Sequence, residues 1–227
     1  MKKSFLLLAT LFLLGWTVQA QVYLIPKAGI TSSNVNFDQD LANQKSNMGF
    51  VGGLGISFPI TSDNFIAIQP EILYIQKGYK ADAGVLAFNN DNTRVNYNYL
   101  EVPLLLKVNF GEDAFKAFVN GGPSFGYALG GRARSDNQDS KIKFGDDAPT
   151  SDVTYLNPDN YNRLDIGIQF GVGAGIAAGP GDLTLEARYG IGLTDFNNIS
   201  GAPDSQNKSK NRVIALMLGY AIPFGGR

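Results

Sequence analysis

The stretch Tyr99–Phe110 reads YLEVPLLLKVNF and sets a carboxylate and an ammonium into a run of large apolar residues. When every second position is taken, the mixture separates into two sets. One set is entirely apolar and consists of Leu100, Val102, Leu104, Leu106, Val108 and Phe110. The other set contains Tyr99, Glu101 and Lys107, together with Pro103 and Leu105. Because successive side chains of a strand point to opposite faces, the stretch predicts a β-strand with one apolar and one partly charged face.

The same alternation recurs along the chain, and no segment shows a convincing helical stripe. Eight segments carry it: 22–33, 48–58, 66–77, 99–110, 116–129, 163–176, 183–193 and 211–224. The connections also alternate. Short turns at 59–64, 109–114 and 179–182 interleave with long polar stretches at 35–46, 78–93, 131–161 and 195–210. This asymmetry is typical of membrane barrels, in which short turns face the periplasm and long loops face outward.

We therefore predict that residues 21–227 form an all-β domain, an eight-stranded antiparallel up-and-down transmembrane β-barrel. The predicted location is the outer membrane of the cell envelope, with the lipid bilayer as the surroundings of the apolar face. The even number of strands places both termini on the periplasmic side. A closed barrel also satisfies the backbone hydrogen bonds that hydrocarbon leaves without water.

The second face of each segment decides which side is inside. It is rich in glycine, which weakens a strand and packs nothing if it faces water. In a barrel of eight strands, the same glycines make room for larger lumen side chains. The charges on this face nearly balance, so we predict paired charges in a plugged or nearly plugged lumen. The predicted network consists of Lys27, Glu71, Lys77, Glu101, Lys107, Lys116, Arg163, Asp165, Glu186 and Arg188.

Two finer expectations concern single positions. Glu101 and Lys107 lie about 20 Å apart along one strand, too far to pair with each other. We expect their partners on neighbouring strands, among Lys77, Lys116 and Glu71. The prolines argue against an uninterrupted barrel, because proline cannot donate to a strand ladder. Bulges or strand ends are therefore expected at Pro26, Pro70, Pro103 and Pro123.

Residues 1–20 are predicted to be a secretory signal peptide. Lys2 and Lys3 precede an apolar run, which ends in Val18-Gln19-Ala20, so cleavage is expected between Ala20 and Gln21. The run is shorter than the roughly 20 residues that a membrane-spanning helix needs. No cysteine follows the cleavage site, which argues against a lipid anchor.

The composition excludes several classes of function. The chain has 19 basic and 20 acidic residues, and removal of Lys2 and Lys3 leaves 17 against 20, a net charge of −3. This balance predicts no nucleic-acid partner. The absence of cysteine and histidine removes thiol nucleophiles, thiolate metal sites and a Ser-His-Asp triad. We predict no enzyme activity, no cofactor and no metal. A hydrolase would need serine with a carboxylate or lysine, and no such constellation stands out.

Three further motifs have both a functional and a structural interpretation. Gly173-x-Gly175-x-x-Ala178 fits a dinucleotide fingerprint formally, but Pro180 and Gly181 follow where a helix is required. The carboxylate pairs on the charged face could be a general acid and base, although nearby cations favour structural pairing. The acidic loop 131–161 could bind a divalent cation or a protein partner, and it lacks EF-hand spacing.

The chain end resembles the C-terminal signal read by the outer-membrane assembly machinery. Its residues are Gly219, Tyr220, Ile222 and Phe224, and the assembly machinery is accordingly a predicted partner. An aromatic girdle on the last strand is the alternative interpretation. Both interpretations imply an outer-membrane location.

Several motifs together resemble one family. The stretches are Gln69–Tyr74 with Gln76-Lys77-Gly78, Tyr99–Lys107, Phe170–Gly175 and Tyr189–Leu193. They are similar to the small outer-membrane β-barrel domain common in Bacteroidetes, labelled porin-like or PorT-like. The resemblance implies barrel architecture and leaves the activity open. The hypotheses are a structural or interaction role through the outer loops or within an envelope complex, a narrow porin-like channel or apolar-ligand transporter, and an accessory barrel of a secretion system.

Overall fold

The computed structural model describes residues 21–37, 44–81, 93–112, 115–135, 139–142, 163–194 and 209–224. The predicted signal peptide lies outside these residues. Within them, no helix is long and apolar enough to cross a membrane.

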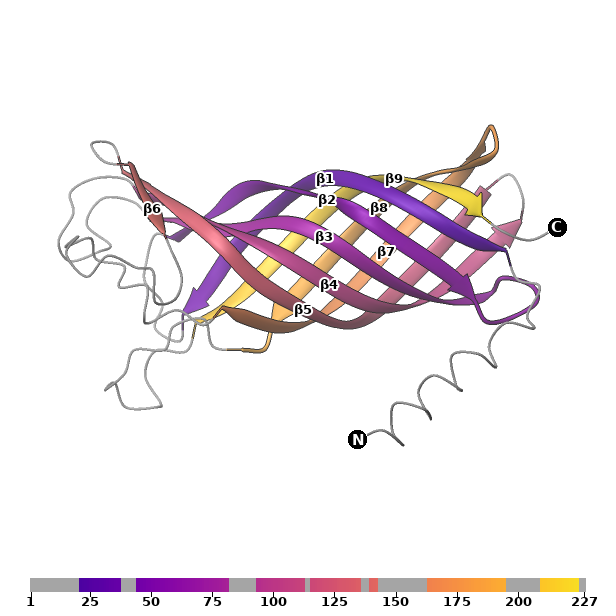
Figure 1. The fold of residues 1–227 in the computed structure, drawn as a ribbon, viewed down its shortest axis with the longest axis horizontal. Coiled ribbons are helices and arrows are strands. Elements are labelled where there is room, and N and C mark those ends of the chain that lie inside the picture. The colour runs from indigo at the N-terminus through magenta and orange to yellow at the C-terminus, as the bar shows by residue number, and fades with distance from the viewer. Residues whose placement is uncertain are drawn as a thin grey trace, which may run out of the picture.

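Eight antiparallel strands close into a barrel (Figure 1). The strands are β1 (Val22–Phe37), β2 (Gln44–Pro59), β3 (Ile66–Ala81), β4 (Thr93–Glu112), β5 (Phe115–Ser135), β7 (Leu164–Ala178), β8 (Gly181–Gly192) and β9 (Ser209–Phe224). Each pairs with its neighbour along the chain, and the pairing of β1 with β9 closes the ring. The predicted fold class, an eight-stranded up-and-down barrel, is confirmed.

The two ends of the barrel differ. Val22 pairs with Phe224, so the first strand begins and the last strand ends at the same end of the barrel. The connections 60–65 and 179–180 also lie there, and we call it the turn end. The opposite end, where β5 ends and β9 begins, is called the loop end. A short ninth strand, β6 (Asp139–Ile142), pairs only with β5 and extends the wall at the loop end (Figure 1).

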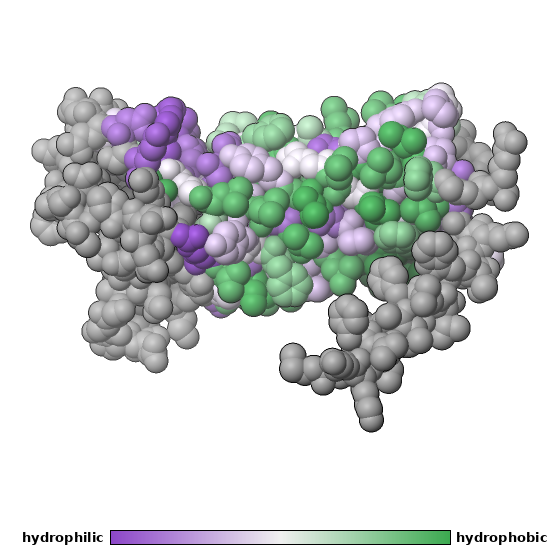
Figure 2. Space-filling model, viewed as in Figure 1, coloured by the Kyte–Doolittle hydropathy of each residue, from purple (hydrophilic) through white to green (hydrophobic). Residues whose placement is uncertain are grey.

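Apolar side chains cover the outer wall of the barrel. Leu104, Val172 and Leu216 expose 48%, 62% and 46% of their surface, although all three are large and apolar. On β4 the outward set runs from Leu100 to Phe110, about 33 Å along the strand and about 25 Å along the axis at a tilt of roughly 40°. Figure 2 shows this belt around the middle of the molecule, with hydrophilic residues gathered toward the loop end. Its height matches the hydrocarbon-facing band of a membrane barrel.

The loop boundaries predicted for the loop end are wrong in detail. Residues 131–135 continue β5, and 139–142 form β6, although the whole of 131–161 was predicted as a loop. The alternation of inward and outward residues persists there, but the outward set becomes polar, with Arg132 and Arg134. Without apolar outward residues, the period-2 signal disappears from the sequence while the strand goes on. The rest of the predicted partner-binding loop, 136–138 and 143–161, lies outside the described residues.

The expectation of bulges or strand ends at the prolines is also wrong. Register shifts occur at Ser46/Val51 and Asn98/Tyr99, and neither involves a proline. Instead, the four prolines lie within strands, next to gaps in the ladder, as at Pro26 between β1 and β9. The register is unchanged across each gap, so a proline removes its own bond without displacing the strand.

The glycines of β7 are required where lumen side chains approach the backbone. A Cβ atom at Gly173 would lie 2.6 Å from the backbone oxygen of Leu185 and even closer to the ring of Phe118. A Cβ at Gly171 would lie 2.6 Å from Asn120 Oδ1. These positions leave no space for a methyl group, as the inward placement of the glycines predicts.

Gly173→Ala is therefore expected to lower the free energy of unfolding by about 1–3 kcal/mol, the usual range for overpacking. Gly190→Ala is the matched control, because its new Cβ would have Gln169 Cγ at 3.7 Å, an ordinary contact. The control is expected to change stability by less than about 0.5 kcal/mol. Urea titration of the two variants in lipid vesicles measures the difference, and equal effects would contradict this account of Gly173.

Candidate functional site in the barrel lumen

Two cations and two carboxylates form a closed ring inside the barrel. Lys27 Nζ lies 2.7 Å from Glu71 and 3.0 Å from Glu186, and the Arg188 guanidinium lies 2.6 Å from Glu71 and 2.5 Å from Glu186. The four residues come from β1, β3 and β8, and each is at most 7% exposed. Every charge thus has two partners of opposite sign, which is the arrangement that buried charges require.

A second charged group lies beside the first and closer to the loop end. Lys77 Nζ contacts Glu101 at 2.5 Å and Asp165 at 3.0 Å. Its ammonium also lies 5.0 Å from the centroid of the Tyr99 ring. Asn211 Nδ2 donates a hydrogen bond to Asp165 at 3.1 Å. Glu101 therefore has the partner predicted on a neighbouring strand, Lys77, and Lys116 has no part in this group.

Amide side chains join the two groups into one network, which we call the lumen network. Gln169 donates to Glu101 and accepts from Arg188 Nη1 at 3.3 Å. Gln69 donates to Glu71 at 2.6 Å, and Asn120 donates to Glu186 at 2.9 Å. The network draws side chains from all barrel strands except β2. The sequence reasoning missed these amides because it searched the inward face for charges, although their inward parity was visible.

Little space remains beside the lumen network. A cavity of about 30 Å³ lies among Lys77, Glu101, Asp165, Gln169 and Arg188. That volume accommodates about one water molecule. The side chains of the lumen network consequently fill most of the barrel interior at the position along the axis where they lie.

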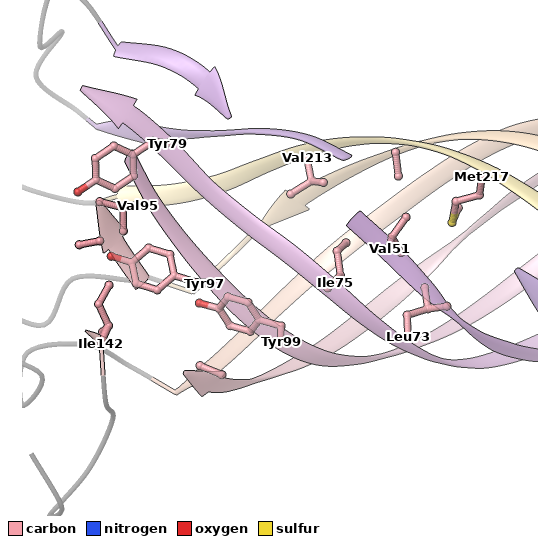
Figure 3. Close-up of a cluster of buried hydrophobic side chains, with 13 residues drawn as sticks. Val51, Leu73, Ile75, Tyr79, Val95, Tyr97, Tyr99, Ile142, Val213 and Met217 are labelled. Atoms are coloured by element: carbon pink, nitrogen blue, oxygen red, sulfur yellow. The ribbon is translucent and has the colours of Figure 1, made fainter. Parts of the chain in front are cut away.

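An apolar and aromatic layer fills the lumen between the network and the loop end. Figure 3 shows Tyr79, Tyr97 and Tyr99 among Ile75, Val95 and Val213, all pointing into the barrel. Tyr97 and Tyr99 are at most 1% exposed. Paired charges were predicted in the lumen, and Tyr99 was placed there, but a continuous apolar layer was not predicted. The signal was present in Leu73 and Ile75, which interrupt the polar set of β3 with apolar residues.

Lys107 and Lys116 lie on the other side of the network, at the turn end. They line an open cavity of about 770 Å³, which forms the mouth of the barrel. Lys116 Nζ pairs with Asp182 at 2.8 Å. Lys107 forms no ion pair with any residue that the structure describes, and its Nζ lies 4.1 Å from the centroid of the Phe118 ring. The expectation that Lys107 pairs with a carboxylate such as Glu71 is therefore wrong, because Lys27 and Arg188 already occupy that carboxylate.

Arg163 does not join the lumen network either. Its guanidinium donates to the Tyr127 hydroxyl at 2.9 Å, and Tyr127 is 43% exposed on the outer wall. Arg163 precedes the first residue of β7, and its carbonyl accepts a backbone hydrogen bond from Ala128 of β5 at 2.8 Å. The assignment of its side chain to the lumen was wrong, because the guanidinium turns toward Tyr127 on the outer wall.

The predicted assembly signal lies on the last strand. Tyr220, Ile222 and Phe224 have the outward parity of β9, and Phe224 is 71% exposed, whereas Gly219 faces the lumen. The Tyr220 hydroxyl donates to the Ala178 carbonyl at 2.7 Å. The geometry suits an aromatic residue at the edge of the belt, and the role in assembly stays a prediction.

Comparison with known proteins gives consistent results. A family model described as outer membrane protein beta-barrel domain matches residues 19–198. OprG from Pseudomonas aeruginosa has a similar structure, with a TM-score of 0.50, 13% identity, and coverage of 91% of this chain and 100% of that chain. Ail, the attachment invasion locus protein of Yersinia pestis, matches with a TM-score of 0.43, 14% identity, and coverage of 89% and 98%. No curated protein matches the chain in sequence. At such identities the likeness shows the fold alone.

Proposed function

Because the chain belongs to the outer membrane protein beta-barrel domain family, we propose that it is a closed, non-enzymatic barrel of the outer membrane that acts by interaction. In this proposal the barrel is a rigid anchor, and the segments at the loop end contact a partner in the envelope or outside it. The competing functions are a narrow channel or apolar-ligand transporter, and an accessory barrel of a secretion system.

The lumen network is the observation that carries the proposal. Lys27, Glu71, Glu186 and Arg188 satisfy one another across the barrel, and the adjacent cavity has room for about one water molecule. A channel needs sites that bind weakly enough for a solute to leave. Here the charged side chains bind each other instead. The apolar layer around Tyr97 and Tyr99 adds a second obstruction on the loop side.

The proposed orientation follows from the two ends of the barrel. Membrane barrels of this type have short periplasmic turns and longer external loops. We propose that the turn end, with both termini, faces the periplasm. The loop end then faces outward, where rigid scaffolds commonly present segments that bind partners.

Conductance in planar bilayers tests whether the barrel is closed. Purified, refolded protein is expected to give no steady unitary currents. A variant that removes two charges of each sign (Lys27→Ser, Glu71→Ser, Glu186→Ser and Arg188→Ser) and shortens the apolar layer (Tyr97→Ser and Tyr99→Ser) is expected to give resolved current steps, because it reduces both obstructions without changing the net charge. A heat-shifted band on unboiled gels verifies that both proteins are folded. Steady currents from the natural sequence that vanish on neutralising Lys107 and Arg188 would establish a channel instead.

A further inference from the structure

Four basic residues form a row across four adjacent strands at the loop end. The register pairs Lys45 with Lys80, Lys80 with Arg94, and Arg94 with Arg134. Lys80 and Arg94 have the outward parity of their strands, whereas Lys45 and Arg134 lie beyond the register shifts of β2 and β5, and Lys45, Arg94 and Arg134 are exposed. Neighbouring strands lie about 4.8 Å apart, so the row extends for roughly 14 Å around the barrel wall. We call these four residues the basic row.

The centre of this register, where Lys80 lies opposite Arg94, is electrostatically unfavourable by itself. Like charges directly opposite each other on adjacent strands destabilise a sheet. Arg134 has a carboxylate neighbour, Asp139 of β6, with an Nε to Oδ2 distance of 3.4 Å. Lys80 and Arg94, at the centre of the row, form no ion pair with any residue in the described ranges. Within the part of the chain that the structure describes, Lys80 and Arg94 therefore offer positive charge to an external anion.

The basic row lies just above the apolar belt. On β2 the belt begins at Met48, three residues from Lys45, and on β5 it ends at Leu129, five residues from Arg134. These separations are about 10–17 Å along a strand, and less along the axis because the strands tilt. The headgroup layer of a bilayer occupies this level, about 5–8 Å beyond the hydrocarbon on each side. Long basic side chains also reach toward it with their charged ends.

The far side of the barrel lacks this arrangement. Lys210 and Arg212 of β9 lie at a similar level and expose their side chains. Their partners on β1 are Asn36 and Asn34, both uncharged, and Arg212 faces Ile191 on β8. Among the described residues, the like-charge register is thus confined to one sector, from β2 to β6, where Arg132 also pairs with Lys141. Scattered basic residues at a membrane surface would not produce such a sector.

We propose that the basic row binds the phosphate groups of anionic lipid headgroups in the leaflet at the loop end. Lysine and arginine both bind phosphate, arginine through paired donors and lysine as a point charge. Lys80 and Arg94 form the centre of the site. The inference goes beyond the proposed function, because it requires only the membrane location and is independent of whether the lumen conducts.

Lipid titration followed by native mass spectrometry tests the site. The protein in zwitterionic detergent micelles is titrated with phosphatidylglycerol and, separately, with phosphatidylcholine. Lys80→Gln/Arg94→Gln is expected to weaken phosphatidylglycerol binding by roughly tenfold or more and to leave phosphatidylcholine binding unchanged. The matched control Lys210→Gln/Arg212→Gln removes the same two residue types at the same level and is expected to bind like the natural sequence. The exchange Lys80→Arg/Arg94→Lys keeps both charges and is expected to retain binding.

Three results would overturn the proposal. If the two Gln double variants lost phosphatidylglycerol binding equally, the lipid would be attracted by the overall positive charge of the loop end and not by the basic row. A natural sequence that binds both lipids equally would show that the basic row selects no anion. Displacement of phosphatidylglycerol by an equal concentration of inorganic phosphate would identify soluble phosphate as the ligand. A heat-shifted band verifies the fold of each variant before titration.

Discussion

Replacing Arg188 with Met is expected to destabilise the barrel by about 3–5 kcal/mol, the range for breaking a buried ion pair by removing one partner. Arg188 contacts both Glu71 and Glu186, and it is 4% exposed. Met fills a comparable volume without charge, so Glu71 and Glu186 would share Lys27 as their remaining close cation. Urea unfolding in phosphatidylcholine vesicles, followed by the heat-shifted band, measures the loss.

A second variant separates the charge effect from a packing effect. In Glu71→Gln/Arg188→Met, the uncompensated carboxylate is removed together with its partner, so much of the lost stability is expected to return. Arg134→Met is the surface control. Its pair with Asp139 joins side chains that are 54% and 52% exposed, so its loss is expected to cost less than about 1 kcal/mol. If Arg188→Met cost no more than Arg134→Met, the lumen network would contribute little to stability.

Leu216→Arg is expected to cost about 1–3 kcal/mol in lipid vesicles, between the penalties for a cation at the bilayer midplane and at the interface. Leu216 lies on β9 with 46% of its surface exposed, between Ile214 and Leu218 of the apolar belt. Arg212, four residues away on the same outward face, shows where the belt gives way to charge. The same urea titration provides the measurement.

Leu216→Ala controls for the lost side chain, because it shortens the residue without adding charge. Its effect is expected to be smaller than that of Leu216→Arg, and the difference isolates the charge. Thickness of the bilayer supplies another check. A thinner bilayer brings the headgroups nearer to residue 216, so the penalty for arginine is expected to fall. The assignment of this face to lipid would be contradicted if Leu216→Arg cost no more stability than Leu216→Ala and if its cost did not change with the thickness of the bilayer.

Parity along the sequence was sufficient to predict the barrel and the two faces of its strands. Leu100 to Phe110 face outward, and Glu101 faces the lumen, because alternation is a backbone property that tertiary contacts do not change. Partner choice could not be predicted in the same way. Glu101 and Lys107 share one face of β4, yet Glu101 pairs with Lys77 while Lys107 points into the open mouth. That outcome depends on register and shear, which bring residues distant in sequence to one level.

The failures at the strand ends have a similar cause. Arg163 lies one residue before β7, and its guanidinium turns outward to Tyr127. Residues 131–135 continue β5 after its outward face has become polar. In both cases the alternating apolar residues of the belt are what the sequence reveals. The strands extend beyond the belt, so their ends carry no such signal. The amides Gln169 and Asn120 were missed for a different reason, because their importance comes from linking charges that only the closed barrel brings together.

The strands differ greatly in length, which gives the loop end a slanted rim. β5 has 21 residues and β4 has 20, whereas β8 has 12. At roughly 3.3 Å per residue and a tilt of about 40°, β5 rises some 53 Å along the axis and β8 some 30 Å. The ordered sheet of β4 and β5 therefore extends farther from the bilayer than that of β8. A large molecule that approaches the loop end along the barrel axis therefore contacts the ordered sheet of β4 and β5 first. The loop end is asymmetric around the barrel axis for this reason.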